Sequence, residues 1–405
     1  MPEMVKKFLE RIAGFLPQKN PAIATPGSIP PGILFVAMPT SIHTARWLSQ
    51  FENCRNYKVH VFPSAIGDWH NDIVNNKNLI LHKFVDPKDF KFLNISDKII
   101  NDTSLHIGNI IRKTKPAIIH TLQIQHSGYL VLPLKIKYKE SFPLWFCSAW
   151  GGDISYYGQL EHHKKKTGLV LENIDALFSG DLLSINKAKE LYNFNKPVLN
   201  VPSPGGIHTD HYRGLVDFTN PSQRRNIAVK GYTGGVHRPE VIFKALEMCA
   251  EDIKNKNLSI VVYMPGISDD IFESFMKMGI NVIKFKHTEN HADVLKMFAT
   301  ARINVACSIT DGVPNSMIEG MIMGSFPIQS NSGSVEEYVS NGINGFLLEP
   351  TDIDGFAEKL KVAIHDDDLV DTAADYSYKT IKSKMDYETV KEKVFEFYDH
   401  FKKGN

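Results

Sequence analysis

The fold of this chain is decided by residues 308–349, which read SITDGVPNSMIEGMIMGSFPIQSNSGSVEEYVSNGINGFLLE. The run that leads into them, residues 303–308, is short and β-prone, and Phe326–Gln329 has the apolar character of the next buried strand. Gly312, Pro314 and Asn315 form a loop that cannot be helical, so the unit is strand, loop, helix, strand. This is the layout of a ligand crevice at the edge of an open parallel sheet.

Two carboxylates stand eight positions apart across the start of this helix, Asp311 in the loop and Glu319 in the helix. Asn315 or Ser316 is expected to cap the helix. The backbone N–H groups of its first turn, around Ser316 and Met317, favour an anion such as a diphosphate. Glu319 is expected on the exposed side of the helix, where its carboxylate can accept hydrogen bonds from vicinal hydroxyls such as those of ribose.

The same segment resembles the donor-binding motif of family 4 glycosyltransferases of the GT-B fold, in which an acidic residue, seven others and a glutamate precede a small-residue helix. Asp311 departs from the glutamate that is more common in the family. The likeness continues in register through a Gly-x-x-Pro step, a glycine pair and a glutamate before an Asn-Gly turn, at Gly324, Pro327, Ser332, Gly333, Glu337, Asn344 and Gly345.

The resemblance implies an α/β protein of the GT-B fold, with two Rossmann-like doubly wound parallel-sheet domains that face each other across a cleft. It also implies that Glu319 holds the ribose of a nucleotide donor and that Asp311 contacts the donor sugar. The donor-binding set expected from it comprises Lys230, Arg238, Gly312, Val313, Pro314, Asn315, Ser316, Met317 and Glu319.

Lys230 and Arg238 belong to the motif VKGYTGGVHRPE at residues 229–240. They lie near the positions where the family has an arginine and a lysine, but they do not match those positions exactly. The alternative is that they are ordinary solvated side chains at the end of a strand and the start of a helix. In the first interpretation they stabilise the charge on the leaving diphosphate in place of a metal. The resemblance therefore implies no metal site and no cofactor, since the nucleotide-sugar is a substrate.

The N-terminal half is expected to carry the remaining catalytic residues, directly after three predicted strands, in residues 41–48, 120–129 and 150–154. Many family members have a His-Gly-x-x-Asp-like element at the third site, where this chain has Trp150, two glycines and Asp153. The catalytic candidates are therefore Asp153, Asp311 and His120. A structural role is the alternative for each of the histidines His43, His120 and His126.

Strands and helices alternate along the chain, which indicates parallel sheets in two domains. No Gly-x-Gly-x-x-Gly follows the first strand, which argues against a dinucleotide oxidoreductase. The predicted division is an amphipathic helix and proline-rich arm at 1–31, an acceptor-side domain at 32–205, a donor-binding domain at 206–385, and a final helix at 386–405 that returns to the first domain. The predicted strands lie at residues 32–38, 58–62, 79–83, 117–122, 144–148, 176–179, 226–230, 259–263, 281–285, 303–306 and 326–329.

Composition excludes several classes of protein. The chain has 405 residues, with 46 basic and 45 acidic side chains, a balance that argues against a general nucleic-acid binder. The four cysteines form no Cys-x-x-Cys pair, so neither a zinc site nor a disulfide framework is indicated, and three of them adjoin apolar runs typical of buried thiols in a reducing cytoplasm. The acidic run at residues 366–368 is better explained by helix capping than by a metal site.

Two segments suggest contact with a membrane or a partner. Residues 1–16 have an amphipathic helical pattern that fits peripheral contact with the inner face of a membrane, or docking on protein. The run at residues 162–166 is expected to be a solvated loop, with attraction to an anionic lipid head group as the alternative. No run approaches the roughly 20 apolar residues that span a bilayer, so the protein is expected in the cytoplasm.

These expectations together indicate a retaining glycosyltransferase that moves a sugar from a nucleotide diphosphate, most simply a UDP-sugar, to a glycan or lipid-linked acceptor in surface polysaccharide or glycoconjugate biosynthesis. Two alternatives remain at this point. One is a nucleotide-sugar epimerase of the same fold, and the other is a non-catalytic scaffold that binds sugar nucleotides.

Overall fold

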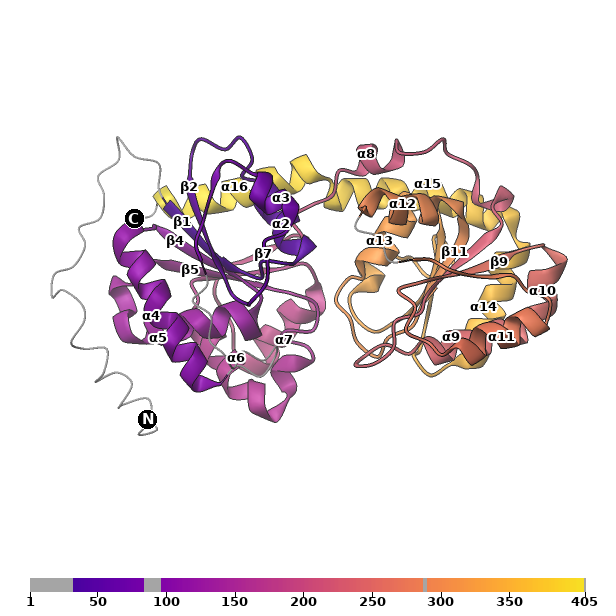
Figure 1. Cartoon of the computed structure of the whole chain (residues 1–405), viewed down its shortest axis with the longest axis horizontal. Helices are drawn as coiled ribbons and strands as arrows, with labels where there is room; N and C mark the ends of the chain where they lie inside the picture. The colour runs from indigo at the N-terminus through magenta and orange to yellow at the C-terminus, as the bar shows by residue number, and fades with distance from the viewer. Residues whose placement is uncertain (1–31, 84–95, 287–289, 404–405) are drawn as a thin grey trace. The chain divides into compact units, whose positions relative to one another are not determined.

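The computed structural model describes residues 32–83, 96–286 and 290–403 (Figure 1). These residues form two compact units. The N-terminal unit extends to Gly205 without Asp181–Leu183, and the C-terminal unit comprises these three residues and the chain from Gly206. The amphipathic pattern predicted for residues 1–16 and the proline-rich arm lie outside the described residues. In the described part of the chain, every helix is too short or too polar to cross a membrane.

The N-terminal unit is built on a parallel sheet with the strand order β3-β2-β1-β4-β5-β6-β7. The order reverses between β1 and β4, which is the topological switch point where open sheets of this kind bind ligands. All six strands predicted for this half are confirmed, and the three-residue β7 adds one more at the sheet edge. The strands are β1 (Gly32–Ala37), β2 (Lys58–Pro63), β3 (Leu79–Leu81), β4 (Ile118–Leu122), β5 (Leu144–Ala149), β6 (Ala176–Ser179) and β7 (Val198–Asn200).

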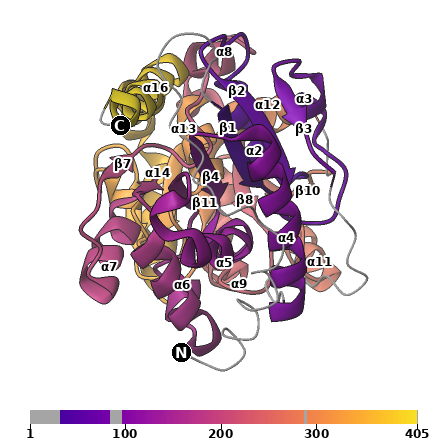
Figure 2. The ribbon, with the colours of Figure 1, turned by 90° about the vertical axis from the view of Figure 1, so that its left-hand side faces the viewer.

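Helices cover both faces of this sheet. Helices α4, α5 and α6 pack next to one another on the face that receives Leu34 and Val36 of β1 (Figures 1 and 2). Helix α2 lies against the other face, where its Trp47 meets His120 of β4 with ring centroids 5.4 Å apart. The helices are α2 (Ile42–Ser49), α3 (Asn71–Asn75), α4 (Asp97–Thr114), α5 (Tyr129–Tyr138), α6 (Glu161–Asn173) and α7 (Leu182–Tyr192).

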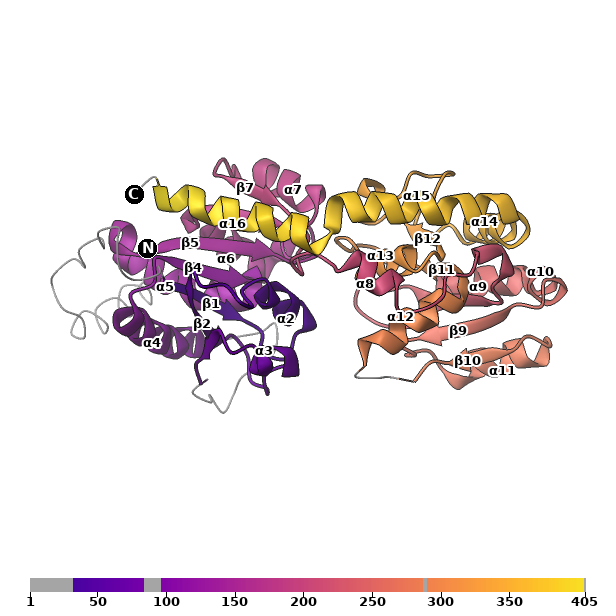
Figure 3. The same cartoon turned by 90° about the horizontal axis from the view of Figure 1, so that it is seen from above.

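The C-terminal unit contains a second parallel sheet, with the order β10-β9-β8-β11-β12-β13 (Figure 3). The order again reverses beside the first strand of the unit, here between β8 and β11. Both sheets are therefore doubly wound, which confirms the predicted pair of Rossmann-like domains. The strands are β8 (Asn226–Lys230), β9 (Ser259–Tyr263), β10 (Val282–Lys284), β11 (Ala301–Ala306), β12 (Phe326–Ser330) and β13 (Phe346–Leu348).

Alternate residues of these strands enter two apolar layers, as the period of a strand requires. Ile227 and Val229 of β8 face the layer formed with α9, α10, α11 and α14, whereas Ala228 faces the layer formed with α12 and α13. The helices of this unit are α8 (Thr209–Arg213), α9 (Pro239–Met248), α10 (Ala250–Asn255), α11 (Asp269–Lys277), α12 (His291–Thr300), α13 (Asn315–Ile322), α14 (Ile353–His365), α15 (Asp367–Met385) and α16 (Tyr387–Lys403).

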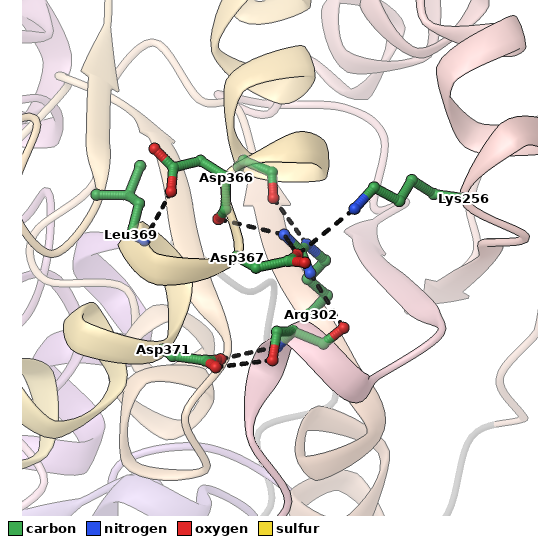
Figure 4. Close-up of polar contacts among 8 residues, drawn as sticks. Lys256, Arg302, Asp366, Asp367, Leu369 and Asp371 are labelled. Carbon is green, nitrogen blue, oxygen red and sulfur yellow. Dashed lines mark hydrogen bonds and ion pairs between the residues drawn. The ribbon is translucent and has the colours of Figure 1, made fainter.

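The acidic run at residues 366–368 caps α15, as predicted (Figure 4). The Asp366 carboxylate accepts a hydrogen bond of 2.9 Å from the backbone N–H of Leu369. Asp367 forms an ion pair of 2.7 Å with Arg302, whose side chain is only 2% exposed. The guanidinium of Arg302 also donates to the carbonyl oxygens of Ala363 and Asp366. The run therefore joins strand β11 to the connection between α14 and α15.

The structure tests two smaller expectations from the sequence. Residues 162–166 lie within α6 rather than in a loop, because the apolar positions of residues 167–171 extend the helical pattern. The burial predicted for three of the four cysteines is confirmed, and it raises the thiol pKa to about 12 for Cys147 and to about 11 for both Cys249 and Cys307.

Candidate functional site

The loops that follow β8 and β11 are bonded to each other at the switch point of the C-terminal sheet. The backbone N–H of Arg238 donates to the carbonyl oxygen of Cys307 at 2.9 Å, and that of Ile309 donates to Val236 at 2.8 Å. The motif at residues 229–240 and the start of the segment at residues 308–349 are therefore held side by side, as their positions after neighbouring parallel strands require.

Charged side chains from both loops lie close enough to change one another's pKa values. Lys230 ends β8, and burial lowers the pKa of its ammonium group while the nearby Asp311 opposes that shift. Burial also lowers the pKa of His237, and the positive charge of Lys230 lowers it further. Lys230 and Asp311 therefore lie near enough at one edge of the sheet for their charges to interact.

Arg238 is engaged by its own loop. Its guanidinium donates hydrogen bonds of 3.0 Å to the carbonyl oxygen of Gly235 and of 2.8 Å to that of His237. It also lies 3.9 Å from the Glu240 carboxylate. To contact a ligand, this side chain would have to exchange these partners, so Lys230 is the better placed of the two predicted cations.

Asp311 is held by the neighbouring strand connection. Its carboxylate accepts a hydrogen bond of 2.8 Å from the backbone N–H of Gly312, and its own N–H donates to the carbonyl oxygen of Ser332 at 2.9 Å. A second backbone bond joins Ser334 to Gly312 at 3.3 Å. A Cβ at Gly333 would overlap the carbonyl oxygens of Asp311 and Gly312, so the close approach of these loops requires glycine there.

Helix α13 begins differently from the prediction. Its first residue is Asn315 and its N-cap is Pro314, and in the described part of the chain no side chain caps it. Neither Asn315 nor Ser316 provides the expected cap, because both already lie within the first helical turn. The positive end of the helix therefore starts directly after the loop of Gly312 and Val313, without a side chain to neutralise it.

Two residues beneath this helix were not predicted from the sequence. The side-chain amide of Asn304, in β11, donates to the carbonyl oxygen of Ser316 at 2.8 Å. Tyr263, at the end of β9, donates its hydroxyl proton to the Asn304 amide oxygen at 3.2 Å. A Cβ at Gly320 would come within 2.5 Å of the Asn304 amide nitrogen, so the helix lies close to the strand here. An asparagine between Ile303 and Val305 was the signal available in the sequence.

Glu319 is buried rather than exposed, which corrects the prediction. The residue is 6% exposed, because its side of α13 faces α12. Its carboxylate oxygen Oε1 lies 2.9 Å from Nε2 of His291, the first residue of α12. His291 had not been singled out in the sequence, where nothing in its spacing relates it to Glu319.

Asp153 of the N-terminal unit is buried and has structural partners. Its carboxylate oxygen Oδ2 accepts backbone hydrogen bonds of 2.9 Å from Ile124 and of 3.1 Å from Trp150. It therefore ties the connection after β5 to the segment after β4, in the same unit. Because the Asp153 carboxylate is used to hold these two backbone segments together, it is poorly placed to contact a substrate.

His120 lies inside β4 and is fully buried. Its ring is packed between Trp47 and Phe178, at centroid distances of 5.4 and 4.5 Å, and its Nε2 lies 2.9 Å from the Ser148 hydroxyl. Burial lowers the pKa of His120 to about 3, so the ring is neutral near neutral pH. The structure therefore favours the structural alternative for His120 over a catalytic role.

The switch point of the N-terminal sheet has unusual backbone geometry. Gln123 follows β4 with a φ of 84°, and a π-helix spans Ile124–Gly128 immediately after it. His126 lies in this π-helix, and burial lowers its pKa to about 4. His43, in the first turn of α2, meets Trp150 edge to face at 5.6 Å. Strained residues and π-helices concentrate at functional sites. Gln123 lies in the candidate segment 120–129 but was not singled out there, and its backbone now marks it as a candidate site residue.

Metal ligands are not assembled at either switch point. Among residues 32–83, 96–286 and 290–403, no three His, Cys, Asp or Glu side chains are grouped so that they could hold a metal ion.

Two family models match the chain, one in each half. Residues 32–181 match the "Glycosyl transferase 4-like" model, and residues 232–382 match the "Glycosyl transferases group 1" model. The second match includes the loops after β8 and β11 and the helix α13 that bears Glu319.

Similarities to individual known proteins agree with these matches. The capsular polysaccharide biosynthesis glycosyltransferase CapM of Staphylococcus aureus is 24% identical over 233 residues, which are 55% of this chain and 59% of CapM. A glycosyltransferase from Rickettsia africae superposes with a TM-score of 0.70 at 14% identity, covering 93% of this chain and 100% of that one. HepE of Anabaena, solved in complex with UDP, has a TM-score of 0.67 at 11% identity, with 91% and 100% covered. At these identities the solved structures establish the fold.

Proposed function

The chain belongs to the family 4-type glycosyltransferases of the GT-B fold, and on that basis we propose that it transfers a sugar from UDP to a hydroxyl of a glycan or lipid-linked acceptor. The observation that carries the proposal lies in the C-terminal unit. There, Lys230, Asp311 and the start of α13, which no described side chain caps, meet at the switch point of one sheet. A cation and a helix N-terminus beside a carboxylate suit a ligand that carries both a diphosphate and hydroxyl groups.

Each group has a separate role in this proposal. Lys230 and the backbone N–H groups of Asn315 and Ser316 bind the diphosphate. The N–H of Met317, which was also predicted to contribute, instead donates to the carbonyl oxygen of Pro314 at 3.0 Å. Asp311, held by its bond to Gly312, accepts hydrogen bonds from the hydroxyls of the donor sugar. Glu319 accepts them from the ribose. Arg238 contributes only after it exchanges its present bonds to Gly235 and His237.

The proposed reaction retains the configuration of the anomeric carbon. The bond from that carbon to the β-phosphate oxygen breaks, and a bond to the acceptor oxygen forms on the same face. The acceptor proton passes to the departing phosphate oxygen, so that UDP leaves without a protein nucleophile. Lys230 and the helix start offset the charge that grows on this oxygen, which lowers the barrier by electrostatic stabilisation and gives a reaction that needs no metal.

The choice of UDP and of a glycan acceptor rests on two similar proteins. HepE of Anabaena has been solved with UDP, and CapM acts in capsular polysaccharide biosynthesis. We extend both features to this chain, and with them a place in the assembly of surface polysaccharide or glycoconjugates at the inner face of the membrane.

A screen of nucleotide-sugars tests the proposal. We expect a UDP-sugar to raise the melting temperature, since a ligand at about 100 times its Kd adds about 2.7 kcal/mol of stability. Transfer to an acceptor should continue in EDTA, and NMR of the product should show the donor's anomeric configuration. A product with the inverted configuration, or stabilisation by no nucleotide-sugar, would refute the corresponding part of the proposal.

A non-catalytic scaffold is the second candidate, and one observation favours it. The N-terminal residues predicted to be catalytic, Asp153 and His120, are both buried in structural contacts, and Trp150 replaces the family's histidine. UDP binding in calorimetry without transfer, and without slow hydrolysis of any donor, would support the scaffold. Interconversion of two UDP-sugars without an acceptor would instead indicate an epimerase.

A further inference from the structure

His291 contacts Glu319, the residue proposed to bind the ribose, and has so far been given no role. Its Nε2 lies 2.9 Å from Oε1 of Glu319, and the two side chains are 31% and 8% exposed. Both belong to the C-terminal unit, with His291 at the start of α12 and Glu319 in the middle of α13. The histidine therefore reaches the carboxylate from a different helix than the one that carries it.

A buried carboxylate needs hydrogen-bond donors, because a buried carboxylate without a partner destabilises a protein far more than an exposed one does. Nε2 of His291 is at donor distance from one of its oxygens. Such a bond also holds the glutamate side chain in one rotamer. Without it, a ligand would have to order the side chain, at an entropic cost of about 1.5–2 kcal/mol. A carboxylate fixed in advance therefore binds hydroxyls more tightly than a mobile one.

The histidine is itself held in place. Asn290 caps α12 by accepting a hydrogen bond of 3.2 Å from the backbone N–H of Ala292, which fixes the first turn of the helix. The ring of Tyr212, from α8, lies 5.4 Å from the imidazole of His291. Farther along, Leu295 and Phe298 of α12 pack in one apolar layer with Met321 of α13. The distance between the two helices is thus set by packing.

We propose that His291 is a positioning residue that orients Glu319 toward the ribose and so makes the site prefer a ribonucleotide to a 2′-deoxyribonucleotide. The inference rests on the proposed function, since it requires Glu319 to accept the ribose hydroxyls. In this inference, the choice between ribose and deoxyribose in the nucleotide depends on both His291 and Glu319. Only Glu319 belongs to the family motif.

The test compares UDP with 2′-deoxyuridine diphosphate by calorimetry on the full chain. We expect the wild type to bind UDP at least about tenfold more tightly, because the deoxy analogue lacks one hydroxyl and a hydrogen bond to a charged group contributes about 1.5–3 kcal/mol. His291→Ala should lose most of this ratio, because the carboxylate is no longer oriented. His291→Gln should restore much of it, because its amide nitrogen can donate from a similar position. In turnover, His291→Ala should raise the donor KM more than it lowers kcat.

His365→Ala is the matched control. His365 forms the same kind of pair with Asp252, at 2.7 Å, in a different part of the C-terminal unit. This variant should keep the wild-type preference for UDP, which shows that losing a histidine–carboxylate pair is not by itself sufficient. Circular dichroism of each variant establishes that it is folded.

Three results would overturn the inference. If His291→Ala keeps the full preference while Glu319→Gln loses it, Glu319 needs no positioning by His291, and the proposed function stands. If both histidine variants lose UDP and its deoxy analogue equally, His291 acts on the general structure of the unit. If wild type and Glu319→Gln both fail to discriminate, the ribose role of Glu319 and the inference fall together.

Discussion

Gly333 lies so close to Asp311 that a Cβ at position 333 would overlap the Asp311 carbonyl oxygen. The two residues belong to loops that follow neighbouring strands, β11 and β12, and the N–H of Asp311 donates to Ser332 at 2.9 Å. The obstacle would be backbone rather than a flexible side chain, so a methyl group at position 333 cannot be accommodated by a change of rotamer. The position of the proposed sugar-binding carboxylate thus depends on the absence of a side chain in the adjacent loop.

Gly333→Ala is therefore expected to displace Asp311 and weaken the site. We expect about a tenfold or greater rise in the donor KM and a lower melting temperature, because overpacking costs about 1–3 kcal/mol. Steady-state kinetics and thermal unfolding measure these effects. Gly108→Ala is the control, because there an added Cβ meets only the end of Leu134, at 3.3 Å. Unchanged donor kinetics in Gly333→Ala would show that the loop can move without consequence.

Lys230→Met tests the proposed contact with the diphosphate. We expect UDP to bind about 100-fold more weakly while uridine binds as before, since a charge-assisted hydrogen bond contributes about 1.5–3 kcal/mol. Burial lowers the pKa of Lys230. Its cationic form is therefore lost at a lower pH than that of an ordinary lysine, and UDP affinity should decline earlier as the pH rises. Calorimetry over a pH series measures both effects, with the exposed Lys244→Met as control.

Equal weakening of uridine and UDP by Lys230→Met would contradict a role at the phosphates. The same conclusion would follow if the pH dependence of the variant matched that of the wild type.

Much of the fold could be predicted because strand period and strand order are local properties. The apolar runs at β1, β6, β8 and β9 needed no tertiary information, and their ends were predicted to within a residue. It was harder to predict how a segment packs against other helices and strands. Residues 162–166 look like a solvated loop because they are polar, yet the buried Thr167, Val170 and Leu171 that follow make them the first turns of α6.

The candidate site was predictable only as far as the motif extends along the chain. Asp311 and Glu319 are recognised by their spacing, but the burial of Glu319 depends on α12, which is adjacent in space and separate in sequence. His120 shows the opposite error, since a histidine beside a strand end looks accessible until Trp47 and Phe178 are seen around it. Such contacts join distant parts of the chain, and sequence periodicity cannot report them.

Asn304→Ala tests the support beneath α13. It removes the donor to the Ser316 carbonyl oxygen and the acceptor of the Tyr263 hydroxyl, so the start of the helix loses its attachment to β11. We expect UDP affinity to fall about tenfold, which corresponds to about 1.4 kcal/mol. Tyr263→Phe should have a smaller effect, because it leaves the bond to Ser316 intact. Calorimetry with UDP measures both.

Asn226→Ala is the matched control for this test, since the Asn226 amide donates to Thr300 at the opposite end of β8. It should bind UDP as the wild type does. Equal losses of affinity in Asn226→Ala and Asn304→Ala would contradict a specific role for Asn304.

Arg302 and Asp367 should contribute unequally to stability although they form one ion pair (Figure 4). The Arg302 side chain is buried and also donates to Ala363 and Asp366, so Arg302→Met should cost about 3 kcal/mol. Asp367 is 52% exposed, so Asp367→Asn should cost less than about 1 kcal/mol. Urea unfolding measures both. Loss of transfer activity in a stable Asp367→Asn variant would show that the acidic run serves the reaction and not only the fold.

His120 should make the protein sensitive to acid. Burial holds the pKa of His120 at about 3, against 6.5 for an ordinary histidine. As pH falls below 6.5, His120 is protonated in the unfolded chain, whereas in the folded protein it stays neutral until about pH 3. The free energy of unfolding therefore decreases between these two pH values. One such group contributes up to about 1.4 kcal/mol per pH unit. His60 and His126, with pKa values of about 4, act in the same direction.

His120→Asn removes one of these groups, so its stability should fall less steeply between about pH 7 and about pH 5 than that of the wild type. The slope is the decisive measurement, because the substitution also lowers stability at every pH by disturbing the aromatic layer around Trp47 and Phe178. Equal slopes in His120→Asn and the wild type would mean that the folded protein protonates His120 freely, which would reopen its candidacy as a catalytic residue.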